Sequence, residues 1–304
     1  MQNISYNIDN ITAKIQESRN VQEAAISLEL AYREIISHYC QIIESPQSKQ
    51  ILLLKDNIRP RFWNCVNISD AVKDNILWMS INPSGACKDK SGNYIQREEN
   101  DTKFNNIWNP DDNVKYWRTL ISNIGDILLP YCGHIDILPI HLSKEKEVWN
   151  TFFKDTSSSE FHMVVDLVRC TQEMLELIHP KLIIYSNVST AWLLGLNDSG
   201  WMGYVLEPAE ESHLDDVTKA KKISALRSSI NGYWHSHPSR GLFRIKGISN
   251  SVSKKDKTNL EGSYLLLDYQ VASAYWNQSA LQPGNLNQVW KTIYSFDNSN
   301  TNRQ

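Results

Sequence analysis

From about Asn75 onward, short apolar runs that end in polar residues alternate with stretches of helical periodicity. The runs that predict strands are Ile76 to Asn82, His134 to Leu138, Lys181 to Asn187 and Gly232 to His237. Alternation of buried strands with amphipathic helices is typical of strand–helix–strand units, whose strands pair in parallel. The pattern therefore predicts an α/β fold: a three-layer α/β/α sandwich with a short, mainly parallel central sheet.

Three segments show the apolar spacing of helices. Two of them, over 114–128 and 161–178, are predicted to be crossover helices packed on the sheet. His179-Pro180 ends the second one, because proline cannot continue a helix. The third, over 21–44, predicts an N-terminal helical cap, preceded by a polar and loosely held segment over 1–20.

The chain of 304 residues, with 41% hydrophobic residues, can build one large core with appendages. We expect an N-terminal helical extension over 1–70 and one α/β domain over 71–304 that ends in a C-terminal helical tail. No apolar run approaches the roughly 20 residues that span a bilayer, and the polar N-terminus is unlike a secretory signal. These features predict a cytoplasmic monomer that has no membrane contact and no obligate protein partner.

Cysteine usage and charge restrict the possible functions. The five cysteines are widely spaced and form no CxxC pair, which argues against a disulfide framework, an iron–sulfur cluster and a Cys-rich zinc site. We therefore expect neither a metal nor a cofactor. Since the net charge is only −3, a polyanionic partner would have to bind a local basic patch.

Polar residues close each predicted strand: Asn82-Pro83-Ser84, Asp136, Asn187, and His235 to Ser239. In open parallel sheets, ligands bind beyond the carboxyl ends of the strands. The prolines that follow Asn82 and His237 hold these two residues extended at rigid corners. The sequence therefore predicts a functional site at this edge.

The segment SINPSGA (80–86) resembles the first motif of the uracil-DNA glycosylase superfamily, and HPS (237–239) with the Arg- and Leu-containing stretch after it resembles the second. Between them, WNPDDNVKYWRTL (108–120) and KLIIYSNVSTAWLLG (181–195) are similar to superfamily stretches in the same order. The resemblance covers roughly 75–246, and ordered matches are more specific than either short motif.

The resemblance implies a DNA glycosylase that hydrolyses the N-glycosidic bond of a flipped-out base and leaves an abasic site. Such an enzyme must place a water below C1′ and stabilise the departing base as an anion. By resemblance, Asn82 holds the water and a neutral His237 donates a hydrogen bond to the base oxygen O2. No lysine stands at the matched positions, so the resemblance implies a monofunctional enzyme.

The expected base-binding residues are Ser84, Trp108, Asp136 and Asn187. Trp108 is the preferred stacking candidate over Tyr94 and Phe104. Asp136 stands where uracil-reading branches often carry Asn, and a protonated Asp complements the N4–H donor and N3 acceptor of cytosine. We therefore expect a modified cytosine in phage DNA, or otherwise uracil or a damaged base. Alternatively, Asp136 points away from the base and braces the next turn.

The residues after His237 predict a DNA-contacting loop. Its candidate contacts are Ser239, Arg240, Leu242, Arg244 and Lys246. In a glycosylase this loop enters the minor groove, where Leu242 or Arg240 fills the space that the flipped base leaves. The others would contact phosphates. The alternative is an ordinary solvated charged loop.

Two other functions remain open. His235 and His237 face the same side if they lie on a strand, so they could ligate the metal of a hydrolase, although no third ligand is evident. Otherwise one of them is a core residue, and we expect that to be His235. A catalytically idle member of the superfamily would bind DNA without leaving abasic sites.

Overall fold

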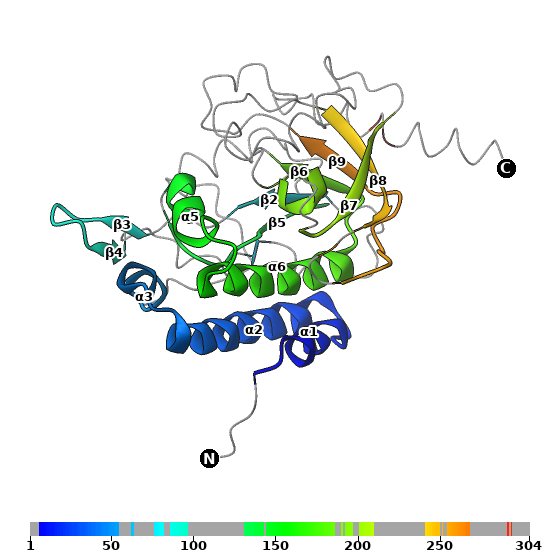
Figure 1. Ribbon diagram of the computed structural model, residues 1–304. Coiled ribbons are helices and arrows are strands. Elements are labelled where there is room, and N and C mark those ends of the chain that lie inside the picture. The colour runs from blue at the N-terminus through cyan, green and yellow to red at the C-terminus, as the bar shows by residue number, and fades with distance from the viewer. Residues whose placement is uncertain are drawn as a thin grey trace, which may run out of the picture. The chain divides into compact units, whose positions relative to one another are not determined.

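The computed structural model describes residues 6–54, 62–63, 76–81, 86–96, 131–142, 144–185, 190, 192–196, 201–209, 241–249, 251, 254–267, 291 and 293. Its main sheet has seven strands in the order β1-β5-β2-β6-β9-β8-β7, and β3 and β4 form a separate two-stranded sheet (Figure 1). The strands are β1 (Phe62–Trp63), β2 (Ile76–Ser80), β3 (Ala86–Lys88), β4 (Tyr94–Gln96), β5 (Cys132–Asp136), β6 (Leu182–Tyr185), β7 (Tyr204–Pro208), β8 (Gly241–Ile248) and β9 (Tyr264–Leu267).

The sheet is parallel at its centre and antiparallel at its margins. Strand β6 pairs in parallel with β2 and β9, whereas β8 is antiparallel to both β9 and β7, and β1 is antiparallel to β5. The predicted α/β class is confirmed, and so are the strands predicted around β2, β5 and β6. The strand predicted over 232–237 and the helix predicted over 114–128 lie outside the described residues.

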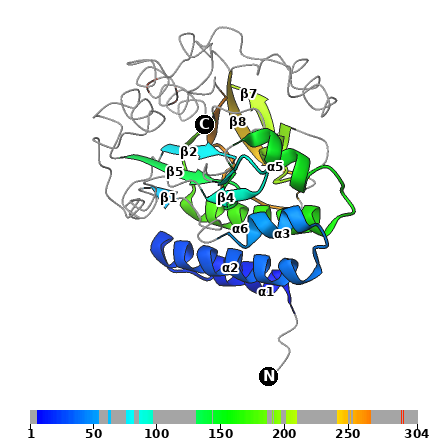
Figure 2. The ribbon, with the colours of Figure 1, turned by 90° about the vertical axis from the view of Figure 1, so that its left-hand side faces the viewer.

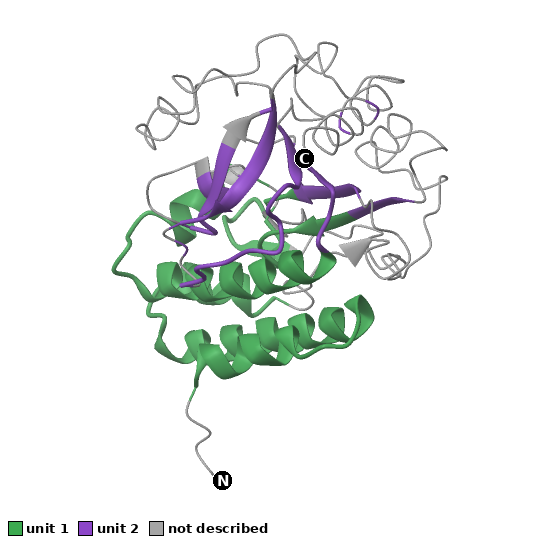
Figure 3. Ribbon diagram, turned by 90° about the vertical axis from the view of Figure 1, so that its right-hand side faces the viewer, with its two compact units in different colours: residues 1–71, 80–107, 134–178 green, residues 72–79, 108–133, 179–304 purple. Residues whose placement is uncertain are grey.

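Contacts divide the chain into two compact units, which Figure 3 shows in different colours. Unit 1 comprises residues 1–71, 80–107 and 134–178, and unit 2 comprises residues 72–79, 108–133 and 179–304. The N-terminal helices thus share a unit with later parts of the chain, and strands β2 and β5 contribute residues to both units.

The helices of unit 1 are α1 (Ile8–Gln16), α2 (Val21–Ile42), α3 (Pro46–Leu52), α5 (Glu145–Phe152) and α6 (Ser159–Ile178). Helix α2 confirms the predicted N-terminal cap, and Asn20 begins it by accepting a hydrogen bond from the amide of Glu23. The prediction of a loosely held segment over 1–20 is wrong for α1. Figures 1 and 2 show α6 between α2 and β5.

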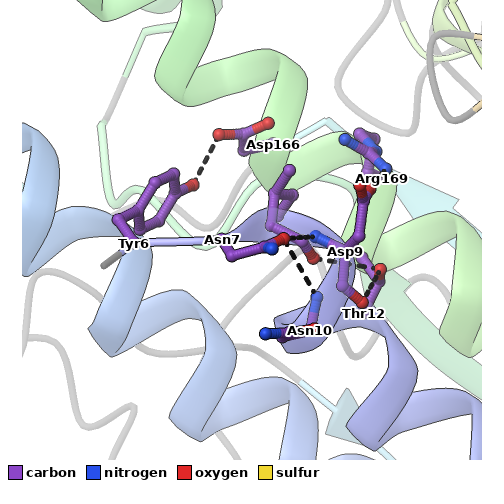
Figure 4. A network of polar contacts seen from close by, with 8 residues as sticks. Tyr6, Asn7, Asp9, Asn10, Thr12, Asp166 and Arg169 are labelled. Carbon is purple, nitrogen blue, oxygen red and sulfur yellow. Dashed lines mark hydrogen bonds and ion pairs between the residues drawn. The ribbon is translucent and has the colours of Figure 1, made fainter. Parts of the chain in front are cut away.

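Polar contacts to α6 explain why the N-terminal segment is ordered (Figure 4). The hydroxyls of Tyr6 and Tyr39 both donate to Oδ2 of Asp166, at 2.5 and 2.9 Å. The guanidinium of Arg169 pairs with the carboxylate of Asp9 at 2.5 Å. These contacts join residues 127 or 160 positions apart, so local apolar spacing gives no sign of them.

Helix α6 confirms the second predicted crossover helix. Its buried positions include Val164, Val168 and Leu175, which lie on the predicted stripe. It ends at Ile178, and His179 then adopts a positive φ of 48° before the proline. The chain thus leaves the helix where the sequence predicts and enters β6.

In unit 2, strand β6 is fully buried, as a central strand of a mostly parallel sheet should be. The irregular helix η4 (Trp192–Leu196) contains Gly195, where φ is 153°. A Cβ at this position would lie 2.1 Å from the carbonyl oxygen of Tyr204 in β7, so only glycine permits this approach. Among the described residues, no helix is both long and apolar enough to cross a membrane.

Candidate functional site

Within unit 1, the chain segments that follow β2 and β5 are bonded to each other. The amide of Ile137 donates to the carbonyl of Ser80, and the amide of Leu138 donates to the carbonyl of Ile81, both at 2.9 Å. From the first bond to the second, the donor and the acceptor each move forward by one residue, so the two segments run parallel. Asn82 follows Ile81 in the sequence, although Asn82 and Ser84 lie outside the described residues.

A buried polar cluster lies at this end of the strands. The Oγ atom of Ser80 is 3.3 Å from Nε2 of His134, and the same nitrogen is 3.9 Å from Oδ1 of Asp136. The side chains of His134 and Asp136 are only 1% and 2% exposed. They lie two positions apart on β5 and so face the same side of the sheet.

Asp136 also lies near a chain of buried hydroxyl groups. Tyr32 in α2 is 2.5 Å from the hydroxyl of Thr171 in α6, which itself donates to the carbonyl of Ile137 at 2.6 Å. Burial is the main cause that raises the pKa of Tyr32. The end of β5 is thus fixed by polar contacts to α6, and both predicted roles of Asp136, base reading and bracing, stay open.

In unit 2, two hydroxyl groups are buried at and after the end of β6 in the sequence. Tyr185 is the last residue of β6, and Thr190 follows it; both side chains are 0% exposed. Neither hydroxyl has a hydrogen-bond partner among the described residues. A buried hydroxyl that lacks a partner costs about 1–3 kcal/mol. The predicted base-binding residue Asn187 falls between them in the sequence, outside the described residues.

The segment predicted to be a DNA-contacting loop is a strand from Gly241 onward. In its register, Gly241 of β8 pairs with Leu267 at the carboxyl end of β9, and Arg244 pairs with Tyr264 at the amino end. The interpretation of this segment as a loop is therefore wrong for 241–246. Leu242 is 1% exposed and part of the core, which does not support its predicted insertion into the minor groove.

Arg244 and Lys246 lie further along β8, toward the amino ends of the parallel strands. The Arg244 guanidinium is 5.9 Å from the centre of the Tyr264 ring, and Nζ of Lys181 is 5.8 Å from the same ring. Lys246 is exposed. Both residues therefore lie away from the end of β8 that Ser239 and Arg240 precede in the sequence. The sequence predicts that both contact DNA; because they lie toward the amino ends of the parallel strands, we expect Arg240 and not these two residues to contact phosphate.

The remaining predicted site residues lie outside the described residues: Asn82, Ser84, Trp108, Asn187, His237, Ser239 and Arg240. Sequence reasoning missed His134, whose spacing of two from Asp136 within a predicted strand was the available signal. No group of three or more His, Cys, Asp or Glu in the described part of the chain could hold a metal, and His235 and His237 lie outside it.

No protein-family model, no curated protein and no solved structure matches this chain.

Proposed function

We propose that the protein is a monofunctional DNA glycosylase, which hydrolyses the N-glycosidic bond of a flipped-out base and leaves an abasic site. One observation carries the proposal: the segments after β2 and β5 are hydrogen-bonded in unit 1, directly before Asn82 and directly after the buried Asp136. Open α/β sheets bind their ligands beyond the carboxyl ends of the parallel strands, which is where these two segments lie. The motif-like segment 80–86 thus begins where such a site is expected.

The chemistry needs two kinds of group at the reacting sugar and base. In the proposed mechanism the Asn82 amide orients the attacking water toward C1′. His237, as a neutral imidazole, donates a hydrogen bond to the O2 oxygen on which negative charge develops. Neither step forms a covalent enzyme intermediate, and the enzyme acts as a cytoplasmic monomer without a cofactor.

The proposed substrate is a cytosine-type base, admitted as a 5-modified cytosine of phage DNA. The buried position of Asp136 supports this choice, because desolvation favours the protonated acid. A protonated carboxyl can donate to N3 of cytosine and accept from its N4 amino group. Ser84, Trp108 and Asn187 complete the proposed base contacts, and Ser239 and Arg240 the proposed DNA contacts.

The proposal is tested with the full-length protein and oligonucleotides that differ in one base. Single- and double-stranded forms carry cytosine, 5-hydroxymethylcytosine, its glucosylated form or uracil, and alkali cleavage scores abasic sites. We expect cleavage at a cytosine-type base, and a rate about 100- to 1000-fold lower for His237→Ala, since one oxyanion donor is lost.

Three results would contradict the proposal. DNA binding without cleavage of any oligonucleotide would identify an idle binding protein. Activity that a chelator abolishes would indicate a metal-dependent hydrolase instead. A larger loss for His235→Ala than for His237→Ala would exchange the roles of the two histidines.

A further inference from the structure

Each unit contains a buried tyrosine and a buried threonine, but the hydroxyls of the two pairs differ in whether they are hydrogen-bonded. In unit 1, Tyr32 and Thr171 are 1% and 0% exposed, and their hydroxyls are bonded to each other. In unit 2, Tyr185 and Thr190 are both 0% exposed, and among the described residues their hydroxyls have no partner. Most buried hydroxyls in proteins are hydrogen-bonded, so the pair in unit 2 is the exception.

The strands beside Tyr185 supply no partner at its level. Its register neighbours are Met79 on β2 and Leu267 on β9, and neither carries a group that bonds strongly to a hydroxyl. Phenylalanine at 185 and valine at 190 would fill nearly the same space without desolvating an oxygen. For folding alone, the two hydroxyls are therefore unfavourable.

The location of Tyr185 indicates that its hydroxyl binds a ligand. It ends β6, which pairs in parallel on both sides, at the carboxyl edge where open α/β sheets bind ligands. Ligand pockets are mostly apolar and contain a few placed polar groups. The buried Tyr185 hydroxyl at this edge fits that description, and the buried Thr190 hydroxyl follows it in the sequence.

We propose that the hydroxyls of Tyr185 and Thr190 bind a neutral polar ligand within unit 2, with Tyr185 contributing from the carboxyl end of β6. The identity of the ligand as a pyrimidine base rests on the proposed function; the presence of a ligand contact rests on the two hydroxyls.

The chemistry of the two groups selects a neutral, planar, polar ligand. Burial raises the pKa of Tyr185 well above its usual range, so its phenol keeps the proton and donates to a carbonyl or ring nitrogen. Thr190 can donate or accept. A phosphate would need compensating charge in such an apolar site, whereas a base needs only hydrogen bonds. The O2 carbonyl of a pyrimidine has two lone pairs, one of which can accept from Tyr185, and Thr190 can accept from an N–H of the base.

The test compares Tyr185→Phe and Thr190→Val with the matched controls Tyr32→Phe and Thr171→Val in the full chain. Thermal unfolding is measured without ligand and with free cytosine, 5-hydroxymethylcytosine or uracil. Without ligand, we expect the unit 2 variants to unfold at the wild-type temperature or above it. The unit 1 variants should unfold about 2 °C lower or more, because each loses a satisfied hydrogen bond.

With ligand, the wild type and the two unit 1 controls should gain the same increase in Tm from at least one base. The unit 2 variants should gain less, corresponding to about threefold to tenfold weaker binding. The inference is overturned if the unit 2 variants are destabilised like the controls, if they keep the full ligand-induced shift, or if no base shifts the wild type.

Failure of the inference and failure of the proposed function give different results. If a base stabilises the wild type and the unit 2 variants lose part of that shift, but no oligonucleotide gains abasic sites, the binding contact stands and the glycosylase activity does not. If abasic sites form and Tyr185→Phe and Thr190→Val keep the wild-type kcat and KM, the activity stands and the contact does not.

Discussion

The Nε2 atom of His134 lies 3.9 Å from the Oδ1 atom of Asp136, and both side chains are buried in unit 1. If Asp136 reads the base, Asp136→Asn should move the preference from cytosine toward uracil. An Asn amide complements the N3–H donor and O4 acceptor of uracil, whereas an ionised Asp can only accept and would face O4 unfavourably. The check is the ratio of initial rates of abasic-site formation on duplexes that differ only in the target base.

Asp166→Asn is the matched control for this substitution. Asp166 is also a buried acid of unit 1, but its carboxylate accepts the hydroxyls of Tyr6 and Tyr39 in the N-terminal network. We expect this variant to lose stability and to keep the wild-type base preference. An unaltered preference in Asp136→Asn would show that Asp136 only braces the end of β5.

Alkaline pH should destabilise the protein through its buried tyrosines. Burial is the main cause that raises the pKa of Tyr32, Tyr39 and Tyr6, and contact with Asp166 adds to it for the latter two. The unfolded chain releases these protons near pH 10, whereas the folded chain retains them. This contribution to stability is therefore complete below about pH 10 and is lost as the pH rises further.

The measurement is the free energy of unfolding as a function of pH, with phenolate absorbance as the second signal. Tyr32→Phe should show a shallower decrease above about pH 10 than the wild type, because one proton fewer is released on unfolding. A smaller rise of phenolate absorbance before unfolding in Tyr32→Phe than in the wild type would contradict the burial of the Tyr32 hydroxyl, because exposed tyrosines contribute equally to both.

The sequence predicts the strands around β2, β5 and β6 because each is an apolar run bounded by polar residues, a local signal. It also contains a signal for β8, since Phe243 and Ile245 alternate with Arg244 and Lys246. The resemblance of the preceding HPS segment to a motif with a DNA-contacting loop led to the wrong interpretation. The order of α1 was not predictable locally, because Asp166 and Arg169 hold it from α6.

For the candidate site too, the sequence predicts the local elements but not the tertiary contacts between them. The sequence predicts a strand over His134 to Leu138 with Asp136 inside it, whereas β5 ends at Asp136. The proximity of His134 to Ser80 depends on how β5 and β2 pair, which one sequence does not specify. The lack of hydrogen-bond partners for Tyr185 and Thr190 among the described residues is a property of tertiary packing, which spacing along the chain does not encode.

Leu242→Ala should lower the free energy of unfolding. Leu242 is 1% exposed in β8 and lies level with Leu266 of β9. Loss of a buried leucine side chain costs about 2–5 kcal/mol, depending on how far the cavity collapses. Chemical denaturation of the wild type and the variant measures this loss. A variant of wild-type stability with impaired DNA binding would instead support the predicted minor-groove insertion.

The salt dependence of DNA binding should show which end of β8 lies near the residues that contact phosphate. Arg240 directly precedes Gly241 at the carboxyl edge of the sheet, whereas Arg244 and Lys246 lie toward the opposite edge. We expect Arg240→Gln to lower the slope of log K against log salt by about one, as for one lost phosphate contact. Arg244→Gln with Lys246→Gln should leave the slope unchanged. The reverse result would place the DNA contact at the amino edge.

The most direct test of the proposed activity is to quantify released base and abasic sites together for the wild type and Asn82→Ala, purified alike. The substrate is a duplex that carries one cytosine-type base. We predict equal amounts of both products from the wild type. We predict a loss of at least about 100-fold in the variant, which keeps its affinity for the duplex because only water placement is removed. Release of no base by the wild type, or a wild-type rate in Asn82→Ala, would contradict the account.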